Sequence, residues 1–242
     1  MTTLHDPNVE AFQRDALERG GYVYTSPARL SQRLATQRTI DLILQEGAFN
    51  NRNVLDVGCG DGYYTLKWFD HGQPRALTAV DAAPAAVDVA RFKCDGRPIT
   101  FQVADACQLP WPADSFDLVL LQSILHHSEK PETMIAQAFR VAPEVLIHEP
   151  NGYSPGLKVI EKLSPYHRAH QEKSYTSRRL YGWIAQAGGR VVSHRYGGFV
   201  PMFCPDAVAR TMKCAEPLVE ATPLLRQLGC AVVVIRAKRI FK

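Results

Sequence analysis

The sequence lacks the features that typically mark membrane-spanning or secreted proteins. No uninterrupted apolar run approaches the roughly 20 residues of a membrane-spanning helix, and the first residues do not pair a basic stretch with an apolar one. The six cysteines are scattered along the chain, and no two of them form a C-x-x-C pair. We therefore expect a soluble, cytoplasmic protein with reduced thiols, no secretory signal and no membrane span.

Positive charge exceeds negative charge by only a small margin. The 28 Lys and Arg residues outnumber the 24 Asp and Glu residues by four, and no block is rich in Lys or Arg. Nucleic acid is therefore not required as a partner. The 242 residues are 46% hydrophobic, with 16 Gly and 16 Pro, which is the composition of an ordinary globular chain. We expect one large domain that spans residues 1–242.

Short apolar segments alternate with segments of helical periodicity after residue 50. The expected strands are 53–57, 76–80, 99–103, 116–121, 145–148, 190–196 and 231–236. The expected helices between them are 63–69, 83–92, 131–141 and 177–187. This alternation predicts an α/β fold with a doubly wound, mostly parallel sheet.

Glycines and carboxylates follow the first three expected strands. In an open parallel sheet, ligands bind beyond the carboxyl ends of the strands. Three glycines at 58, 60 and 62 allow a tight turn that a ligand can approach closely. Asp81 follows the second strand, where a carboxylate can accept both ribose hydroxyls, and Asp105 follows the third. Together they predict a nucleoside-containing ligand.

Two cofactor classes fit a glycine turn with a downstream acid. The dinucleotide pattern G-x-G-x-x-G needs glycine at 63, where this chain has Tyr63. Asp56 and Asp61 flank the turn, and carboxylates disfavour a pyrophosphate on a helix N-terminus but favour a cation. S-adenosylmethionine, with its adenosine, amino group and sulfonium, is therefore favoured over a nicotinamide dinucleotide, which stays as the alternative.

Four sequence blocks together carry a family resemblance. They are Val54-Leu-Asp-Val-Gly-Cys-Gly-Asp-Gly62, Ala79-Val-Asp81, Ala104-Asp-Ala106 with Leu109-Pro-Trp-Pro112, and Phe116-Asp-Leu-Val-Leu-Leu-Gln-Ser-Ile-Leu-His-His127. With these blocks the chain resembles the class I (Rossmann-like) S-adenosylmethionine-dependent methyltransferases, most closely the type 11, ubiquinone- and menaquinone-biosynthesis-like group. The resemblance covers roughly residues 50–150 and implies a seven-stranded sheet whose last strand, 231–236, is antiparallel.

The resemblance also implies roles for residues of the site. Asp56, Gly58 and Gly60 would line the methionine part of the cofactor, Asp81 would hold the ribose, and Asp105 with the backbone of Ala106 would meet the adenine. The full candidate cofactor site is Tyr24, Asp56, Gly58, Cys59, Gly60, Asp81, Ala82, Asp105, Ala106 and Gln122. Within it, Cys59 is expected to be a small space-filling residue, and Tyr24, with Tyr22, to screen the sulfonium or to pack in the core.

His126 and His127 follow the fourth expected strand, near the place where the methyl acceptor must approach. Methyl transfer is a direct displacement that depends on alignment, and a base helps only when the acceptor carries a proton. An imidazole can remove that proton from an alcohol or phenol. We take both as candidate catalytic residues and prefer His126, which is closer to the strand end; the alternative is that they cap the following turn.

The remaining segments are expected to surround this core. Helices at 9–19 and 27–46 would form an N-terminal cover (residues 1–50) over the cofactor-binding core (51–150), and insertions at 151–173 and 198–229 would form a substrate-facing cap. The candidate substrate-binding residues are His126 and three residues of the first insertion: Tyr166, His167 and His170. The alternative for these three is a solvated helical lid, and no metal site is expected because no acidic third ligand is offered.

At the end of the fifth strand, alternation sends the side chains of His148 and Glu149 to opposite faces, so that at most one faces the cleft. The predicted function is methyl transfer from S-adenosylmethionine, releasing S-adenosylhomocysteine, to a small acceptor, with His126 as a possible general base. The basic cap favours a polar or anionic metabolite. A non-catalytic cofactor-binding subunit is the alternative, and either a monomer or a homodimer is expected.

Overall fold

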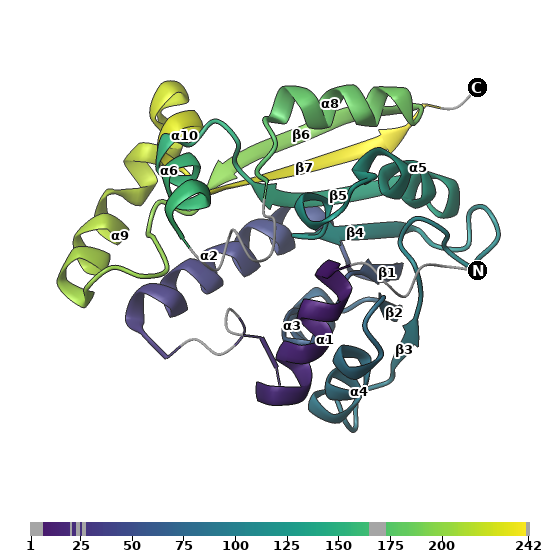
Figure 1. The fold of residues 1–242 in the computed structure, drawn as a ribbon. Coiled ribbons are helices and arrows are strands. Elements are labelled where there is room, and N and C mark those ends of the chain that lie inside the picture. The colour runs from purple at the N-terminus through teal and green to yellow at the C-terminus, as the bar shows by residue number, and fades with distance from the viewer. Residues whose placement is uncertain (1–6, 20, 23–24, 26–27, 165–172, 241–242) are drawn as a thin grey trace.

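A seven-stranded sheet forms the centre of the protein (Figure 1). The computed structural model describes residues 7–19, 21–22, 25, 28–164 and 173–240. The strands, in chain order, are β1 (Asn53–Val57), β2 (Ala76–Asp81), β3 (Ile99–Val103), β4 (Leu118–Gln122), β5 (Glu144–Pro150), β6 (Gly189–Gly197) and β7 (Val232–Arg239). Their order across the sheet is β3-β2-β1-β4-β5-β7-β6, so the first half of the sheet winds outward from β1 and the second half from β4.

Strands β1 to β5 are parallel, whereas β7 runs antiparallel to both of its neighbours, β5 and β6. This confirms the predicted α/β fold with a mostly parallel sheet and an antiparallel last strand. Strand β4 begins at Leu118 rather than at 116, although Phe116 is buried and its N–H bonds the carbonyl oxygen of Val141. Apolarity alone therefore placed this strand's start two residues early.

Helices cover both faces of the sheet (Figure 1). They are α1 (Pro7–Arg19), α2 (Leu30–Gly47), α3 (Tyr63–Gly72), α4 (Pro84–Lys93), the 3₁₀ helix η2 (Leu125–His127), α5 (Pro131–Val141), α6 (Pro155–Leu163), α8 (Ser177–Gln186), α9 (Asp206–Ala221) and α10 (Pro223–Gly229). Alternate residues of β4 point to opposite layers: Leu120 packs with Trp68 of α3, and Val119 belongs to the cluster that holds Ile135 of α5. Each face of β4 is thus apolar, as expected for a buried parallel strand.

The N-terminal helix α1 packs on α4. Ala16 of α1 lies in a small apolar cluster with Ala83 and Ala86. The side-chain oxygen of Gln13 also accepts the backbone N–H of Ala85, at 3.1 Å, in the first turn of α4. Alanines allow the two helices to approach closely, and Gln13 satisfies a donor that the helix itself leaves unpaired.

The two insertions carry the cap. Helix α6 lies in the first insertion, α9 and α10 lie in the second, and all three gather at one end of the molecule (Figure 1). Helix α10 contacts both α6 and α9. The cap is therefore one group of helices built from two separate parts of the chain. Within the described residues, every helix falls short of the length or apolarity needed to span a bilayer.

Candidate functional site

The glycine turn ties the carboxyl end of β1 to that of β2. The N–H groups of Gly58 and Cys59 both donate to the carbonyl oxygen of Val80, at 2.8 and 2.9 Å. Gly58, Gly60 and Gly62 have φ angles of 78°, 53° and 77°, in the left-handed region that favours glycine. The backbone conformation of the turn therefore favours glycine at these three positions, whether or not a ligand binds there.

Side chains from elsewhere in the chain pack directly on this turn. A Cβ on Gly60 would lie 2.6 Å from the Tyr22 ring, and one on Gly58 would lie 2.0 Å from a methyl carbon of Ile124. The turn is thus approached from one side by the N-terminal cover and from another by the segment after β4. Any larger residue at these two positions would close the space in which the ends of β1, β2 and β4 meet.

Asp81 holds the glycine turn with its carboxylate. Its Oδ2 accepts the N–H of Gly60 and its Oδ1 accepts the N–H of Ala83, both at 2.9 Å. Burial raises the pKa of Asp81, and these backbone donors oppose that shift by favouring the charged form. Each carboxylate oxygen has two acceptor positions, so Asp81 keeps acceptor capacity for two ribose hydroxyls.

Asp56 is almost completely buried at the carboxyl half of β1. Its Oδ2 accepts a hydrogen bond from the Thr65 hydroxyl at 2.7 Å. Burial raises the pKa of Asp56 to about 7, which the Thr65 hydrogen bond opposes and the nearby Asp81 increases. A desolvated carboxylate of this kind gains stability from a cation, so its chemistry fits the amino group of S-adenosylmethionine. Sequence reasoning missed Thr65, which carries no motif of its own.

Asp61 faces the N-terminal cover and α4. It accepts hydrogen bonds from the Tyr22 N–H at 3.2 Å and the Thr25 hydroxyl at 2.5 Å, and it pairs with Lys93 at 2.5 Å. Its charge is therefore compensated by Lys93. Asp61 fixes the cover to the core, whereas Asp56 lies in the sheet.

The other candidate cofactor residues lie along the ends of β1 to β4. Asp105 accepts the N–H of Cys107 at 2.7 Å, beside an open hollow of about 570 Å³ that residues 103–105 and 108–112 line. Ala82 and Ala106 directly follow Asp81 and Asp105, and Gln122 ends β4 in a buried position. Cys59 packs with Ala79, Val87 and Phe101, which agrees with a space-filling role, and burial raises the pKa of its thiol.

His126 is held by a carboxylate that the sequence did not single out as its partner. Its Nδ1 lies 2.7 Å from Oε2 of Glu149, which is fully buried at the end of β5. The other oxygen of Glu149 accepts the backbone N–H groups of Ile124 and Leu125, at 3.0 and 2.9 Å. Glu149 therefore fixes both the position of η2 and the orientation of the His126 ring.

The neighbouring His148 forms a second pair with the same loop. Its Nδ1 lies 3.0 Å from the Ser123 hydroxyl, and Ser123 has a φ of 54°, which is uncommon for a residue with a side chain. Burial, with a smaller contribution from the nearby His126, lowers the pKa of His148 to about 4, so this ring is neutral near pH 7. Alternation suggested that at most one of His148 and Glu149 would face the cleft, yet both bond residues 123–126 because this loop crosses the ends of β4 and β5.

The N-terminal cover reaches the histidine pair. The ring of Phe12 on α1 lies 5.3 Å from the Tyr22 ring and 4.9 Å from the His127 ring, measured between centroids. The His126 and His127 rings are 3.9 Å apart. One aromatic chain thus links the glycine turn to the histidines. Tyr24, Tyr166, His167 and His170 lie outside the described residues, so their predicted roles stay predictions.

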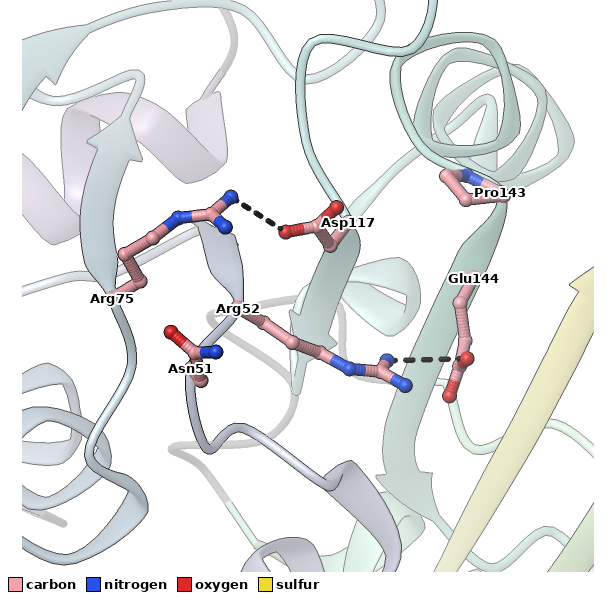
Figure 2. A pocket seen from close by; sticks show the side chains of 6 residues that line it. All are labelled: Asn51, Arg52, Arg75, Asp117, Pro143 and Glu144. Atoms are coloured by element: carbon pink, nitrogen blue, oxygen red, sulfur yellow. Dashed lines mark hydrogen bonds and ion pairs between the residues drawn. The ribbon is translucent and has the colours of Figure 1, made fainter.

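A second hollow, of about 360 Å³, lies at the other end of the strands, where the parallel strands begin (Figure 2). Its lining residues precede β1, β2, β4 and β5 or begin β5, and they are Asn51, Arg52, Arg75, Asp117, Pro143 and Glu144. Figure 2 shows its charged side chains in pairs, Arg52 with Glu144 at 3.1 Å and Arg75 with Asp117 at 3.2 Å. This hollow is at the amino ends of parallel strands, where α/β folds do not usually bind their ligands.

Residues 55–144 match the family described as a methyltransferase domain. Over these residues the chain is similar to methyltransferase domains. The match confirms the predicted methyltransferase resemblance over residues 55–144, and it favours S-adenosylmethionine over the nicotinamide alternative.

Relatives agree in sequence with only part of the chain. The 2-methyl-6-phytyl-1,4-hydroquinone methyltransferase of Spinacia oleracea is 32% identical over 108 residues, which cover 44% of this chain and 31% of that protein. The methyltransferase domain thus matches less than a third of the length of that relative.

Solved structures agree over nearly the whole chain, at low sequence identity. A chain of the complex between the Haloferax volcanii Trm112 methyltransferase activator and a methyltransferase gives a TM-score of 0.69 at 15% identity, covering 95% of this chain and 98% of that one. Magnesium protoporphyrin IX methyltransferase from Synechocystis PCC 6803, solved with bound S-adenosylhomocysteine, gives 0.65 at 17%, covering 96% and 100%. These likenesses confirm the fold.

Proposed function

We propose that this protein transfers a methyl group from S-adenosylmethionine to a small-molecule acceptor that carries an ionisable O–H or N–H group. The observation that carries the proposal is that the ends of β1, β2, β4 and β5 bring together a glycine turn, two carboxylates suited to the cofactor, and a histidine held by a buried carboxylate. The matched methyltransferase domain spans the first three of these strands.

The cofactor would lie along the carboxyl ends of the strands. Asp81 would bind the ribose hydroxyls, Asp56 would face the cationic methionine part together with the backbone of Gly58 and Gly60, and Asp105 would meet the adenine. When bound, the cofactor supplies an electrophilic methyl group on its sulfonium. The cover would limit the access of water through Tyr22, whose ring already packs on the turn.

His126 would act on the acceptor. His126 would accept the proton that the acceptor's oxygen or nitrogen loses as it takes the methyl group from the sulfonium of the cofactor. Glu149 supports this role because it fixes the ring and stabilises the imidazolium that forms, as a buried carboxylate does for an imidazole base. His127, which contacts Phe12, is the second candidate.

The polar or anionic character of the acceptor stays a prediction. It depends on the basic stretch of the first insertion, most of which lies outside the described residues. In the described part, Lys158 binds Glu161 and the carbonyl oxygen of Ser174, both at 3.0 Å, so its charge is already used within the cap.

Parallel calorimetric titrations test the proposal. We expect S-adenosylmethionine and S-adenosylhomocysteine to bind with micromolar dissociation constants, whereas NAD should not bind. Acceptor screening then measures S-adenosylhomocysteine release by the chain without any added protein. Binding of NAD alone would overturn the cofactor assignment. Binding of S-adenosylmethionine, with turnover only when a second protein is added, would favour the alternative of a cofactor-binding subunit in a larger assembly.

A further inference from the structure

The cap helices leave an apolar surface uncovered. We name the leucine patch by its six members, whose exposed fractions lie between 43 and 72%: Val159, Leu163, Leu218, Leu224, Leu225 and Leu228. Single exposed leucines are normal on protein surfaces, but a cluster on adjoining helices marks a surface that contacts something else. Neither α6 nor α10 buries a single residue, although both are rich in leucine.

Helical spacing places these side chains on continuous stripes. Within α9, the exposed positions 214, 218 and 221 recur at intervals of four and three. Thr222 ends that helix in an extended conformation, and within α10 the exposed Leu224, Leu225 and Leu228 form a second stripe. Along α6, Val159 and Leu163 are four residues apart and share one face. Helix α10 contacts both neighbours, and Figure 1 shows the three helices together at one end of the molecule, so the stripes adjoin.

Exposed cations lie beside the patch, and three of the four acids of these helices are held by described partners. At 100° per residue, Lys162 lies on one flank of the α6 stripe, and Arg210 lies on a flank of the α9 stripe, one turn after the exposed Asp206. Glu216 is buried and Glu220 is half-buried, and both pair with Arg38 of α2. Glu161 is held by Lys158 and the N–H of Ser174. Lys162 and Arg210 are thus the exposed cations beside the leucine patch, whereas the charge of Lys158 is held by Glu161.

Leucines bordered by exposed Lys and Arg are the arrangement of helices that lie in a membrane interface. Apolar side chains enter the boundary between headgroups and acyl chains, and the cations meet anionic headgroups. A surface that binds a protein partner typically carries aromatic residues at its centre, whereas the six residues of the patch are all aliphatic. We propose that the leucine patch docks the protein on the surface of an anionic lipid bilayer, without crossing it.

Vesicle sedimentation tests this docking without any use of enzymatic activity. The full chain is mixed with vesicles of phosphatidylcholine and phosphatidylglycerol in equal parts, and separately with vesicles of phosphatidylcholine alone. We expect binding to the anionic vesicles at least about tenfold stronger than to the neutral ones, and weaker as salt is raised. Equal binding to both, or binding to neither, would overturn the proposal.

Two variants localise the contact. Leu224→Gln with Leu228→Gln should weaken binding to the anionic vesicles roughly tenfold or more, since each inserted leucine contributes strongly to transfer from water. Phe92→Gln, at an 84% exposed apolar residue on α4, is the matched control and should bind as the wild type does. Binding that survives the double substitution would overturn the proposal. So would a wild-type dimer in sedimentation velocity that the same substitution makes monomeric, because a second copy would then cover the patch.

Discussion

At the scale of single residues, the site contains two carboxylates that differ in how many hydrogen-bond donors surround them. Asp81 accepts two N–H groups, whereas Asp56 has one hydroxyl donor and is desolvated. The first arrangement suits neutral ribose hydroxyls and the second suits a cation. Under the proposed function, the same residue type would thus serve two different parts of one cofactor because its surroundings differ.

Asp81→Ala tests the ribose assignment. We expect the dissociation constant for S-adenosylmethionine to rise by about 10- to 100-fold, because the change removes hydrogen bonds that involve a charged acceptor and loosens Gly60. Calorimetry measures the change. Asp88→Ala is the control, since Asp88 is exposed on α4 and pairs only with Arg91 among the interactions found for it. Unchanged affinity in Asp81→Ala would place the cofactor elsewhere.

Asp56→Asn tests the buried carboxyl through pH. The pKa of Asp56 in the folded protein is about 7 and its ordinary value is 3.8, so the native state binds more protons between these limits. The stability that the protonated form contributes is present below pH 4 and is lost as pH rises to about 7. Relative to Asp56→Asn, the wild type should lose on the order of 2–4 kcal/mol over this interval. Urea unfolding of both proteins from pH 4 to 8 measures the difference, and parallel profiles would contradict it.

His126→Ala tests the proposed base. We expect turnover to fall by roughly 10²- to 10⁴-fold, the range of general acid–base catalysis, with near-normal binding of S-adenosylmethionine. Glu149→Gln keeps an acceptor for the two N–H groups but removes the charge beside the ring, so it should also lower turnover while the cofactor still binds. His71→Ala, at an exposed position on α3, is the control. Full turnover in His126→Ala would remove this residue from the mechanism.

At the scale of secondary-structure elements, the parallel core was predictable because each of its strands is a short apolar run, and the first three lead into a glycine or an acid. Helix α5 was expected at 131–141 and occupies Pro131–Val141, since Pro131 begins the helix and the apolar spacing is regular. The pairing of His126 with Glu149 was not predictable in the same way. The two residues are 23 positions apart, and Glu149 lies in an apolar strand. The sequence does not tell which loop lies next to the end of that strand.

Contacts between elements also explain why the cap was anticipated only in part. The insertions at 151–173 and 198–229 contain helices α6, α9 and α10. Their leucines could equally have faced inward, because a helical stripe shows that one face is apolar but not whether another element covers it. The uncovered leucine patch follows from the packing of whole elements.

An ion network joins the amino end of β5 to the carboxyl half of β7 and to the residue before β1, and Glu144→Gln should weaken it. Glu144 is buried and pairs with Arg52 at 3.1 Å (Figure 2). It also pairs with Arg236, and with Lys238 at 3.5 Å. Burial alone would raise the pKa of Glu144, but Arg236 and Arg52 outweigh it, and the pKa is lowered. Its stabilising contribution is therefore present above the ordinary carboxyl pKa and is lost as pH falls.

We expect Glu144→Gln to reduce the free energy of unfolding by about 1–3 kcal/mol at pH 7, because three cations lose their shared acceptor. Cofactor binding should not change, since Glu144 lies at the amino ends of the parallel strands and the candidate site lies at their carboxyl ends. Urea unfolding and calorimetry measure the two quantities. Asp88→Asn is the control, because its ion pair with Arg91 on α4 is exposed and worth little. A change in cofactor affinity without a change in stability would contradict this account.

At the scale of the whole molecule, the N-terminal cover connects parts of the site that the sheet keeps apart. Through Asp61 it is fixed to the glycine turn, through Gln13 to α4, and through Phe12 to His127. A cofactor bound at the strand ends would lie beneath this cover. Its binding should therefore order helix α1 and the histidine loop together, although they are more than a hundred residues apart in the sequence.

Hydrogen exchange with saturating S-adenosylhomocysteine tests that coupling. We expect slower exchange in residues 7–19, 58–62 and 124–127, and no change in β6, which lies at the far edge of the sheet. At a ligand concentration 100 times the dissociation constant, the free energy of unfolding should also rise by about 2.7 kcal/mol. The product is used because it binds without turnover. Stabilisation with unchanged exchange in 7–19 would show that the cofactor binds without the cover, and Phe12 would then serve the packing of α1 rather than the closure of the site.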